Sequence, residues 1–213
     1  MGEVVSIQRD GAGAAKAALE RCIAAGGVAI FPADGLYGLA CDPLDAGAIA
    51  RIHRIKGRDD GKPSAVLYFS PLAMRELVEG LGPSTRDAVG ALLPGPVTLV
   101  VANPDRRYPL ACREDPERLG VRLLGGPLGG AMCPLFQTSA NLSGEPASAS
   151  FDEISAEISS AVDLAIDGGA LMGQPSTVVD LTAFDEDGDW RVLRAGGMGP
   201  AELAARLGDL TSR

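Results

Sequence analysis

Short apolar runs alternate with segments of helical periodicity along most of this chain, and the two patterns predict its secondary structure. The apolar runs, which are typical of buried strands, lie at residues 4–7, 28–31, 65–69, 97–101, 119–123, 135–138, 164–166, 177–181 and 190–193. The helical segments lie at residues 14–25, 45–55, 71–79 and 84–92, with one more after Ser150 and a last one from Pro200. Helices separate the strands at first, whereas the later strands cluster. We therefore expect an α/β fold in which helices pack on a mixed β-sheet.

Polar residues mark the starts of three predicted helices. Asp45 is placed as the N-cap of the helix that ends near residue 55. Ser84 with Asp87, and Ser150 with Glu153, have the spacing of a capping box, in which each side chain bonds the backbone N–H group of the other residue. These signals predict where the three helices begin.

Composition limits the class of protein. Hydrophobic residues make up 46% of the 213 residues and aromatic residues 4%, so the core is expected to consist of Val, Leu, Ile and Ala. No apolar run reaches the ~18 residues of a membrane helix, and residues 1–10 do not have the pattern of a secretion signal. We expect one domain over residues 1–213, located in the cytoplasm.

Charge and the rarer side chains narrow the chemistry further. The formal net charge is −9, from 19 basic and 28 acidic residues, which disfavours broad contact with nucleic-acid phosphates or an anionic membrane. Any anion site must therefore be local. Cys22, Cys41, Cys112 and Cys133 contain no C-x-x-C pair, so buried free thiols are expected rather than a zinc or redox site. His53 is the only histidine, which excludes multi-His metal sites and favours a structural role for this side chain.

Polar segments interrupt the apolar pattern where predicted strands or helices meet loops, and binding groups concentrate at such ends. They lie at residues 32–39, 56–58, 122, 138–144, 176–180 and 193–196. Arg122 alternates with Val121 and Leu123 and should face away from both. Taken singly, these segments have ordinary explanations. Lys56 and Arg58 can complement a helix C-terminus, and Ser and Asn can bond their own backbone in a turn.

The order of these segments is similar to the motif set of the YrdC-like threonylcarbamoyl-AMP synthases. The motifs, in order, are P-A-D-G-L-Y-G-L (32–39), K-G-R (56–58), S-A-N (139–141), S-T-V-V-D (176–180) and V-L-R-A-G (192–196). The first resembles the family signature P-T-[DE]-T-x-Y-G-L. The resemblance extends from about Gly27 to Gly197 and implies a YrdC-like twisted mixed β-sheet with packed helices and a concave basic cleft.

The resemblance implies an enzyme that joins L-threonine, bicarbonate and ATP into threonylcarbamoyl-AMP with release of pyrophosphate, for the t6A modification of tRNA. Two cations would be catalytic, namely Lys56 and Arg58. The ATP site would consist of these two residues together with Ser139, Ala140, Asn141 and Arg194. The threonine or carbamate end would lie on Tyr37, Arg122 and Ser176. An enzyme that transfers the product to tRNA would be a downstream partner.

The chemistry of this reaction is consistent with the few titratable groups in the motifs. A carbamate is already an anionic nucleophile, so its attack on the α-phosphorus needs alignment and charge neutralisation more than a strong general base. No metal site on the protein is expected. A magnesium ion would be held mainly by the ATP phosphates.

This chain departs from the family signature at two positions of the segment that helps to bind threonine. Ala33 and Gly35 stand where the family has two threonines. Each hydrogen bond to substrate lost in this way costs about 1 kcal/mol. A second hypothesis is therefore a YrdC-like paralogue that adenylates another carbamate or a carboxylate. A third is a non-catalytic module that binds double-stranded RNA or tRNA, which the net charge of −9 disfavours.

Overall fold

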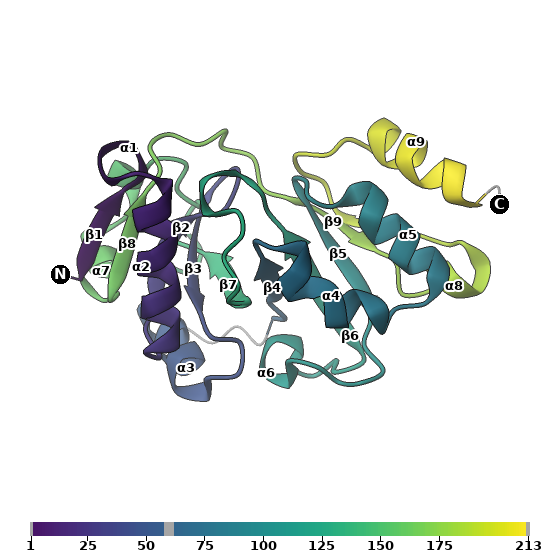
Figure 1. Ribbon diagram of the computed structural model, residues 1–213, viewed down its shortest axis with the longest axis horizontal. Helices are drawn as coiled ribbons and strands as arrows, with labels where there is room; N and C mark the ends of the chain where they lie inside the picture. The colour runs from purple at the N-terminus through teal and green to yellow at the C-terminus, as the bar shows by residue number, and fades with distance from the viewer. Residues whose placement is uncertain (1, 58–61, 212–213) are drawn as a thin grey trace.

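The computed structural model describes residues 2–57 and 62–211, whose strands form one sheet (Figure 1). The strands are β1 (Glu3–Ser6), β2 (Ala29–Pro32), β3 (Tyr37–Cys41), β4 (Ala65–Tyr68), β5 (Val97–Ala102), β6 (Arg118–Leu123), β7 (Leu135–Ser139), β8 (Leu164–Asp167), β9 (Thr177–Asp180) and β10 (Arg191–Arg194). The helices are α1 (Ile7–Asp10), α2 (Ala12–Ala24), α3 (Ala46–Ile55), α4 (Pro71–Glu79), α5 (Pro83–Leu92), α6 (Pro109–Cys112), α7 (Ala156–Ser160), α8 (Phe184–Asp187) and α9 (Pro200–Thr211), with two 3-10 turns, η1 (Gly126–Leu128) and η2 (Phe151–Glu153).

The ten strands follow the order β1-β8-β2-β3-β7-β4-β6-β5-β9-β10 across the sheet. The parallel pairs are β1 with β8, β8 with β2, β4 with β6, and β5 with β9. The remaining neighbours are antiparallel. The expected α/β fold with a mixed sheet and packed helices is therefore confirmed.

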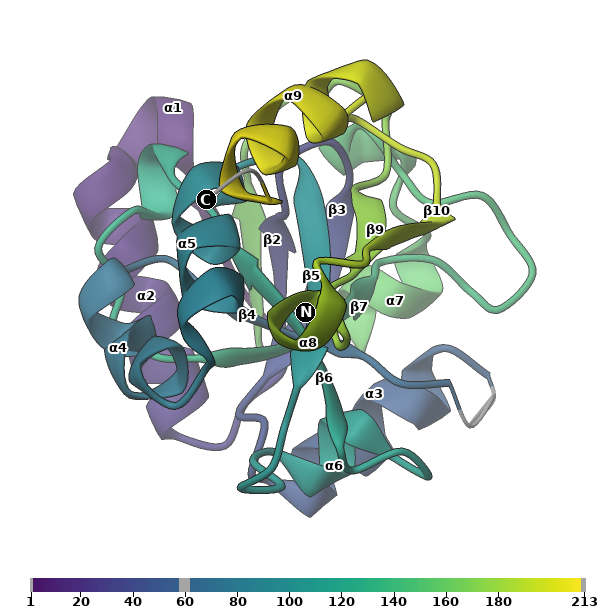
Figure 2. The same ribbon diagram turned by 90° about the vertical axis from the view of Figure 1, so that its right-hand side faces the viewer.

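Helices cover both sides of the strands (Figures 1 and 2). In Figure 1, α2 lies over the end of the sheet that contains β1, β8 and β2, and α4 and α5 lie over the other half. Figure 2 shows these three helices on one side of the strands and α7 on the other. The C-terminal helix α9 packs against α5 and closes that half of the core. None of the helices in the described parts of the chain is long and apolar enough to span a membrane.

The side chains of β5 and β6 alternate between two faces of the sheet. One face is covered by helices and the other faces a cavity. Leu99 and Val121 are fully buried in the core cluster that also contains residues of α4 and α5. Thr98 and Arg122 alternate with them and line the cavity, because successive side chains of a strand point to opposite faces. The expected orientation of Arg122, away from Val121 and Leu123, is thus confirmed.

The predicted cap of α3 is confirmed. Asp45 Oδ1 accepts a hydrogen bond from the N–H group of Ala48 at 2.9 Å. The capping box of Ser150 and Glu153 is also present, although it opens the short turn η2 rather than a long helix. In both caps the donor and the acceptor are three residues apart, so the sequence pattern is enough to predict them.

The predicted capping box of α5 is wrong. α5 begins one residue earlier, at Pro83, and Ser84 does not cap it. Instead, the carboxylate of Asp185 accepts hydrogen bonds from the N–H groups of Ser84 at 2.8 Å and Thr85 at 3.2 Å. This cap comes from α8, 101 positions later than Ser84 in the chain, so Asp87 is left on the exposed face of the helix.

The apolar pattern does not predict β3, although this strand lies in the middle of the sheet between β2 and β7. All five of its residues are buried. A Cβ atom at Gly38 would lie 3.0 Å from the Phe31 ring and 3.2 Å from Gln137 Nε2, so glycine allows the flanking strands to approach. Glycine weakens a strand pattern in sequence, which explains why β3 is not predicted.

The four cysteines are free thiols, as expected. Cys41 and Cys112 are buried, whereas Cys22 and Cys133 are half-buried. Burial raises the pKa of Cys41 to about 12 and the pKa values of Cys22 and Cys133 to about 11. Thiols held in this neutral form are poor nucleophiles and metal ligands.

Candidate functional site

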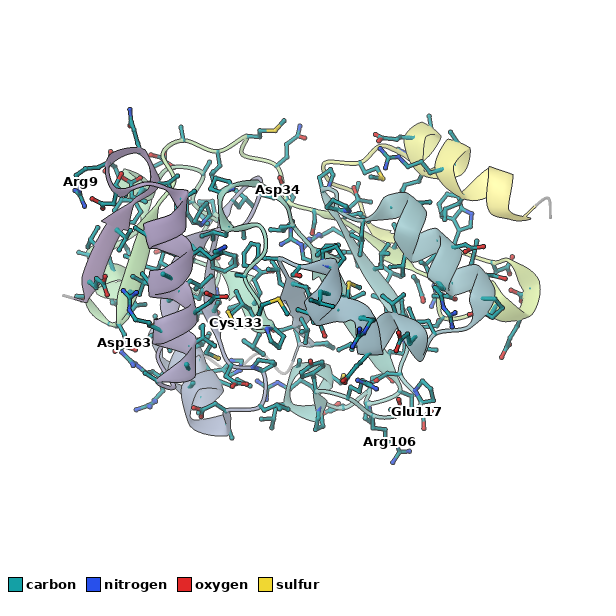
Figure 3. All side chains as sticks on the ribbon, viewed as in Figure 1. Arg9, Asp34, Arg106, Glu117, Cys133 and Asp163 are labelled. Carbon is teal, nitrogen blue, oxygen red and sulfur yellow. The ribbon has the colours of Figure 1, made fainter. Side chains whose placement is uncertain are left out.

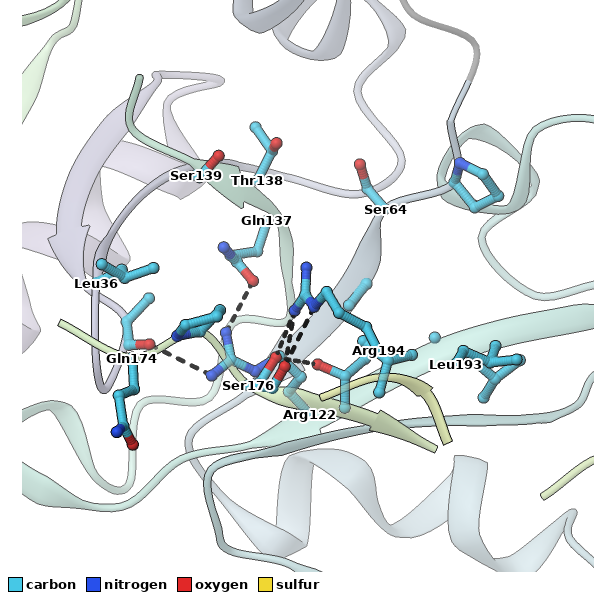
Figure 4. Close-up of a pocket in the computed structure, with 18 of the residues that line it drawn as sticks. Leu36, Ser64, Arg122, Gln137, Thr138, Ser139, Gln174, Ser176, Leu193 and Arg194 are labelled. Atoms are coloured by element: carbon cyan, nitrogen blue, oxygen red, sulfur yellow. Dashed lines mark hydrogen bonds between the residues drawn. The ribbon is translucent and has the colours of Figure 1, made fainter. Parts of the chain in front are cut away.

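A cavity of about 510 Å³ opens on the face of the sheet that carries Thr98 and Arg122 (Figure 4). Its walls come from the β2–β3 turn, from strands β4 to β7, and from the segments around β9 and the end of β10. These segments are far apart in sequence and meet only because the sheet order places their strands together. The cavity brings together five of the predicted site residues, namely Tyr37, Arg122, Ser139, Ser176 and Arg194.

Arg122 is a buried cation in the wall of the cavity, with 6% of its surface exposed. One terminal nitrogen donates to Gln137 Oε1 at 3.0 Å and the other to the carbonyl oxygen of Ala33 at 3.3 Å. Its Nε–H group has no partner in the described chain. Burial lowers the pKa of Arg122 to about 10, with the charge of Arg194 acting in the same direction and that of Asp34 opposing it. Arg122 therefore stays charged at neutral pH and has one unused buried donor.

Arg194 lies at the end of β10 and is held by Ser176. Its Nε and Nη2 atoms donate to the carbonyl oxygen of Ser176 at 3.3 and 2.9 Å, and Nη2 also donates to Ser176 Oγ at 3.1 Å. Desolvation lowers the pKa of Arg194 from its ordinary value. Figure 4 shows Arg194 over Ser176, with Arg122 beside them. The guanidinium is thus fixed through one edge, which leaves Nη1 for a ligand.

Neither of these two guanidiniums forms an ion pair with any carboxylate of residues 2–57 or 62–211. Other arginines do form ion pairs: Arg118, which also lines the cavity, bonds Asp180 at 2.6 Å, and the exposed Arg106 bonds Glu117 at 3.0 Å (Figure 3). Two cations that form no ion pair with these carboxylates, in a concave and partly desolvated space, attract an anion.

Lys56 and the S-A-N segment lie next to this cavity. Lys56 Nζ donates to the carbonyl oxygens of Ser139 at 2.5 Å and Asn141 at 2.8 Å. Ser139 lines the cavity, whereas Ala140 is fully buried and the side-chain amide of Asn141 donates to two backbone carbonyls of the following turn. Lys56 therefore holds the turn that presents Ser139. The predicted residue Arg58 lies outside the described residues.

The hydroxyl group of Tyr37 is already hydrogen-bonded within the protein, so Tyr37 has a structural role in the cavity wall. The hydroxyl donates to the carbonyl oxygen of Gly169 at 2.8 Å and accepts from the N–H group of Gly168 at 2.9 Å. The ring lies 5.9 Å from that of Phe151, and desolvation raises the pKa of Tyr37. Tyr37 thus fixes the loop after β8 to the wall of the cavity.

Gly35 has no room for a side chain. A Cβ atom on this residue would lie 1.9 Å from the carbonyl oxygen of Gln174. The N–H group of Gly173 donates to the carbonyl oxygen of Gly35 at 2.9 Å, so the two loops are bonded face to face. The backbone of Gln174 therefore occupies the space that a side chain at position 35 would need, and glycine leaves no empty hole there.

Several polar residues of the lining are not in the predicted set. They are Ser64, Thr98, Asp115, Arg118, Gln137, Thr138 and Gln174. Thr98 is flanked by the buried Val97 and Leu99, and it could have been found by applying to β5 the alternation that identifies Arg122. Gln137 and Gln174 carry no comparable signal, because their roles depend on contacts with Arg122 and Gly35.

The described chain offers few groups for metal or acid–base chemistry near the cavity. The part of the chain that the structure describes has no group of three or more His, Cys, Asp or Glu side chains that could hold a metal ion. His53 is outside the cavity lining, where its Nε2 atom lies 2.5 Å from Nη2 of Arg113 and its ring meets that of Phe136 edge-on. Within residues 2–57 and 62–211, Asp115 is the only carboxylate in the cavity lining.

Comparisons with known proteins define the family. The profile of the Sua5–YciO–YrdC family, described as telomere recombination, matches residues 21–196. The chain is 34% identical over 174 residues to the threonylcarbamoyl-AMP synthase of Xanthomonas axonopodis pv. citri, which covers 76% of this chain and 92% of that protein. It is also 34% identical to the threonylcarbamoyl-AMP synthase of Chromohalobacter salexigens, over 78% of this chain and 90% of that protein. The chain therefore belongs to the Sua5–YciO–YrdC family.

Solved structures confirm the expected fold. E. coli YciO superposes with a TM-score of 0.76 at 25% identity, over 95% of this chain and 99% of that one. P. abyssi Sua5 complexed with L-threonine superposes with a TM-score of 0.80 at 25% identity, over 97% of this chain. The chain spans 61% of the length of that Sua5. A full-length HypF, at 21% identity and a TM-score of 0.65, shares the fold alone.

Proposed function

We propose that this chain is a threonylcarbamoyl-AMP synthase, which forms threonylcarbamoyl-AMP and pyrophosphate from L-threonine, bicarbonate and ATP. The observation that carries the proposal is the pair Arg122 and Arg194, which line one cavity without a carboxylate partner among the described residues. The names of the curated relatives support the same reaction. The product would pass in the cytoplasm to an enzyme that transfers its threonylcarbamoyl group to tRNA for t6A modification.

The reaction requires anion binding and alignment. The amine of threonine and bicarbonate form a carbamate and water, and a carbamate oxygen then attacks the α-phosphorus while the bond to pyrophosphate breaks. We assign Arg194 to the phosphates, because one edge of its guanidinium is fixed on Ser176. We assign Arg122 and Ser176 to the carboxylate or carbamate end. Fixed donors of this kind stabilise charge in the transition state without reorganisation.

The remaining predicted residues act around this centre. We assign Ser139 to the phosphates and Lys56 to the support of the Ser139 carbonyl, with Ala140 and Asn141 shaping the same turn. Arg58, two residues after Lys56, is assigned to the phosphates by the family motif. A magnesium ion would enter bound to the ATP phosphates, and Asp115 is a carboxylate among the described residues that line the cavity.

Pyrophosphate release tests the proposal directly. Purified protein should release pyrophosphate only when ATP, bicarbonate and threonine are all present. Arg194→Ala and Arg122→Ala should each lower this rate by about 100-fold or more, because each removes a fixed donor. Arg75→Ala is the matched control, since Arg75 is exposed on α4 and pairs with Glu79. No release by the wild type, beside an active synthase from another source, would refute the proposal.

The filled space at Gly35 supports a second candidate, a synthase of the same fold that adenylates a different carbamate or a carboxylate. The backbone of Gln174 replaces a hydroxyl-bearing side chain in this wall, which alters the contacts offered to the amino acid. A panel of amino acids compared by kcat/KM for pyrophosphate release separates the candidates. Threonine should rank first under the leading proposal, and a different first-ranked substrate would favour the second.

A further inference from the structure

A pair of buried hydroxyl groups lies in the floor of the cavity. Thr98 Oγ1 and Ser176 Oγ are 2.8 Å apart, and the two residues are only 8% and 9% exposed. Thr98 is on β5 and Ser176 immediately precedes β9, the parallel neighbour of β5, so the register of the sheet brings them together. Both residues line the cavity.

Counting hydrogens in this pair leaves one donor unused. Ser176 Oγ already accepts a hydrogen bond from Arg194 Nη2 at 3.1 Å. The two hydroxyl groups have one hydrogen each, and the contact between them uses one of the two. Neither hydroxyl has another hydrogen-bond partner among the residues that the structure describes. Whichever oxygen donates within the pair, the other O–H group is free, and both belong to the cavity wall.

The direction of the hydrogen bond between Thr98 and Ser176 does not change this count. If Thr98 donates, Ser176 Oγ accepts from both Arg194 and Thr98 through its two lone pairs, and its own hydrogen is free for the cavity. If Ser176 donates, its bond from Arg194 strengthens that donation, and the hydrogen of Thr98 is free instead. A second unused donor lies close by, because Arg122 Nε–H also has no partner in the described chain. Figure 4 shows Arg122, Ser176 and Arg194 side by side.

We infer that Thr98 is a further positioning residue of the substrate site, which bonds Ser176 so that the pair donates one hydrogen bond to an anionic oxygen of the ligand. The ligand oxygen would lie beside this hydroxyl pair, in the cavity that Arg122 and Arg194 also line. This inference rests on the proposed function only for the identity of the ligand. The hydrogen count holds for any anion that the two guanidiniums bind.

Two substitutions at Thr98 test this role. Thr98→Val removes the hydroxyl and keeps the branched shape, and Thr98→Ser restores the hydroxyl. Calorimetric titrations with L-threonine alone and with ATP alone measure the affinity of each variant. Thr98→Val should weaken the binding of at least one of these ligands about tenfold, the typical effect of losing one oriented hydrogen bond. Thr98→Ser should return the affinity to within about twofold of the wild type.

A buried threonine outside the cavity provides the control for a merely structural effect. Thr85 is 3% exposed, and its hydroxyl donates to Asp185 Oδ2 at 2.5 Å. Thr85→Val should lower the melting temperature and leave both affinities unchanged. Thr98→Val should lower the affinity and leave the melting temperature unchanged, because Ser176 Oγ keeps its hydrogen bond from Arg194 and no buried polar atom loses its last partner.

The outcomes separate the inference from the proposed function. Equal affinities of wild type and Thr98→Val for both ligands would overturn the inference, as would a Thr98→Ser variant as weak as Thr98→Val. Failure of the wild type to bind either ligand would also overturn it. A wild type that binds ATP with the expected dependence on Thr98, yet releases no pyrophosphate with any amino acid, would refute the proposed function and leave the role of Thr98 standing.

Discussion

Replacing Gly35 with alanine adds one methyl group at a point where two loops are already in contact. The new Cβ atom would lie 1.9 Å from the carbonyl oxygen of Gln174, 3.0 Å from its carbonyl carbon and 3.2 Å from its nitrogen. Ordinary contacts begin near 3.4 Å, so the Gln174 carbonyl would have to retreat by about 1.5 Å. That movement would also break the hydrogen bond from Gly173 N–H to the carbonyl oxygen of Gly35, which is 2.9 Å long.

The size of the effect follows from these contacts. Overpacking against backbone costs about 1–3 kcal/mol, and one lost hydrogen bond adds about 1 kcal/mol. Gly35→Ala should therefore lower the free energy of unfolding by about 2–4 kcal/mol. For a chain of this length each kcal/mol corresponds to roughly 2–4 °C, which gives a fall in melting temperature of about 5–15 °C.

A second glycine provides a control with the opposite sign. Gly90 lies in α5, is exposed, and has no atom within 4 Å of the position where a Cβ would be added. Gly90→Ala should raise the free energy of unfolding by up to about 1 kcal/mol, because alanine is the better helix former. Thermal unfolding followed by circular dichroism compares both variants with the wild type. A Gly35→Ala protein as stable as the wild type would refute the contact between these loops and remove the basis for the second candidate function.

Three further outcomes follow from the contacts described above. Asp185→Ala should lower the free energy of unfolding by about 1 kcal/mol, because α5 loses the acceptor at its N-terminus. Asp87→Ala should leave this free energy unchanged. If urea unfolding shows that Asp87→Ala is the more destabilising substitution, the capping box predicted from the sequence is correct after all. Burial by itself would raise the pKa of Asp180, but hydrogen bonds from Thr182 and the neighbouring arginines leave it lowered from 3.8. Asp180 therefore stabilises the fold fully at a pH above its ordinary pKa of 3.8, and this stabilisation is lost as the pH falls through the lowered pKa. The difference in urea midpoint between wild type and Asp180→Asn should shrink in acid. A difference that does not depend on pH would contradict this. Burial raises the pKa of Cys22 from 9.0 to about 11, so its thiolate fraction at pH 8 falls about 100-fold. Cys22 should therefore react slowly with an aromatic disulfide until urea unfolds the protein. Fast labelling of Cys22 in the native protein would contradict its burial.

Much of the fold and part of the site could be predicted from local patterns. The alternation of Arg122 with Val121 and Leu123 gave its orientation, since a strand has a fixed period of two. The Asp45 cap was equally local, because the donor and acceptor lie three residues apart. The motif segments identify Ser139, Ser176 and Arg194 by their order alone, and the structure brings all three to one cavity.

The remaining features depend on residues that are distant in sequence. The cap of α5 comes from Asp185, and Thr98 meets Ser176 across 78 positions because β5 and β9 are parallel neighbours. The space at Gly35 is filled by a loop that no pattern near Gly35 could reveal.

The periodicity and turn chemistry of short sequence segments specify which residue types stand at the strand ends. Which of their donors are already used within the protein depends on the folded chain. Arg118 pairs with Asp180, whereas the Nε–H group of Arg122 has no partner in the part of the chain that the structure describes. Hydrogen bonding and charge compensation in a cavity depend on distances of a few ångströms between segments, and the order of the strands sets those distances.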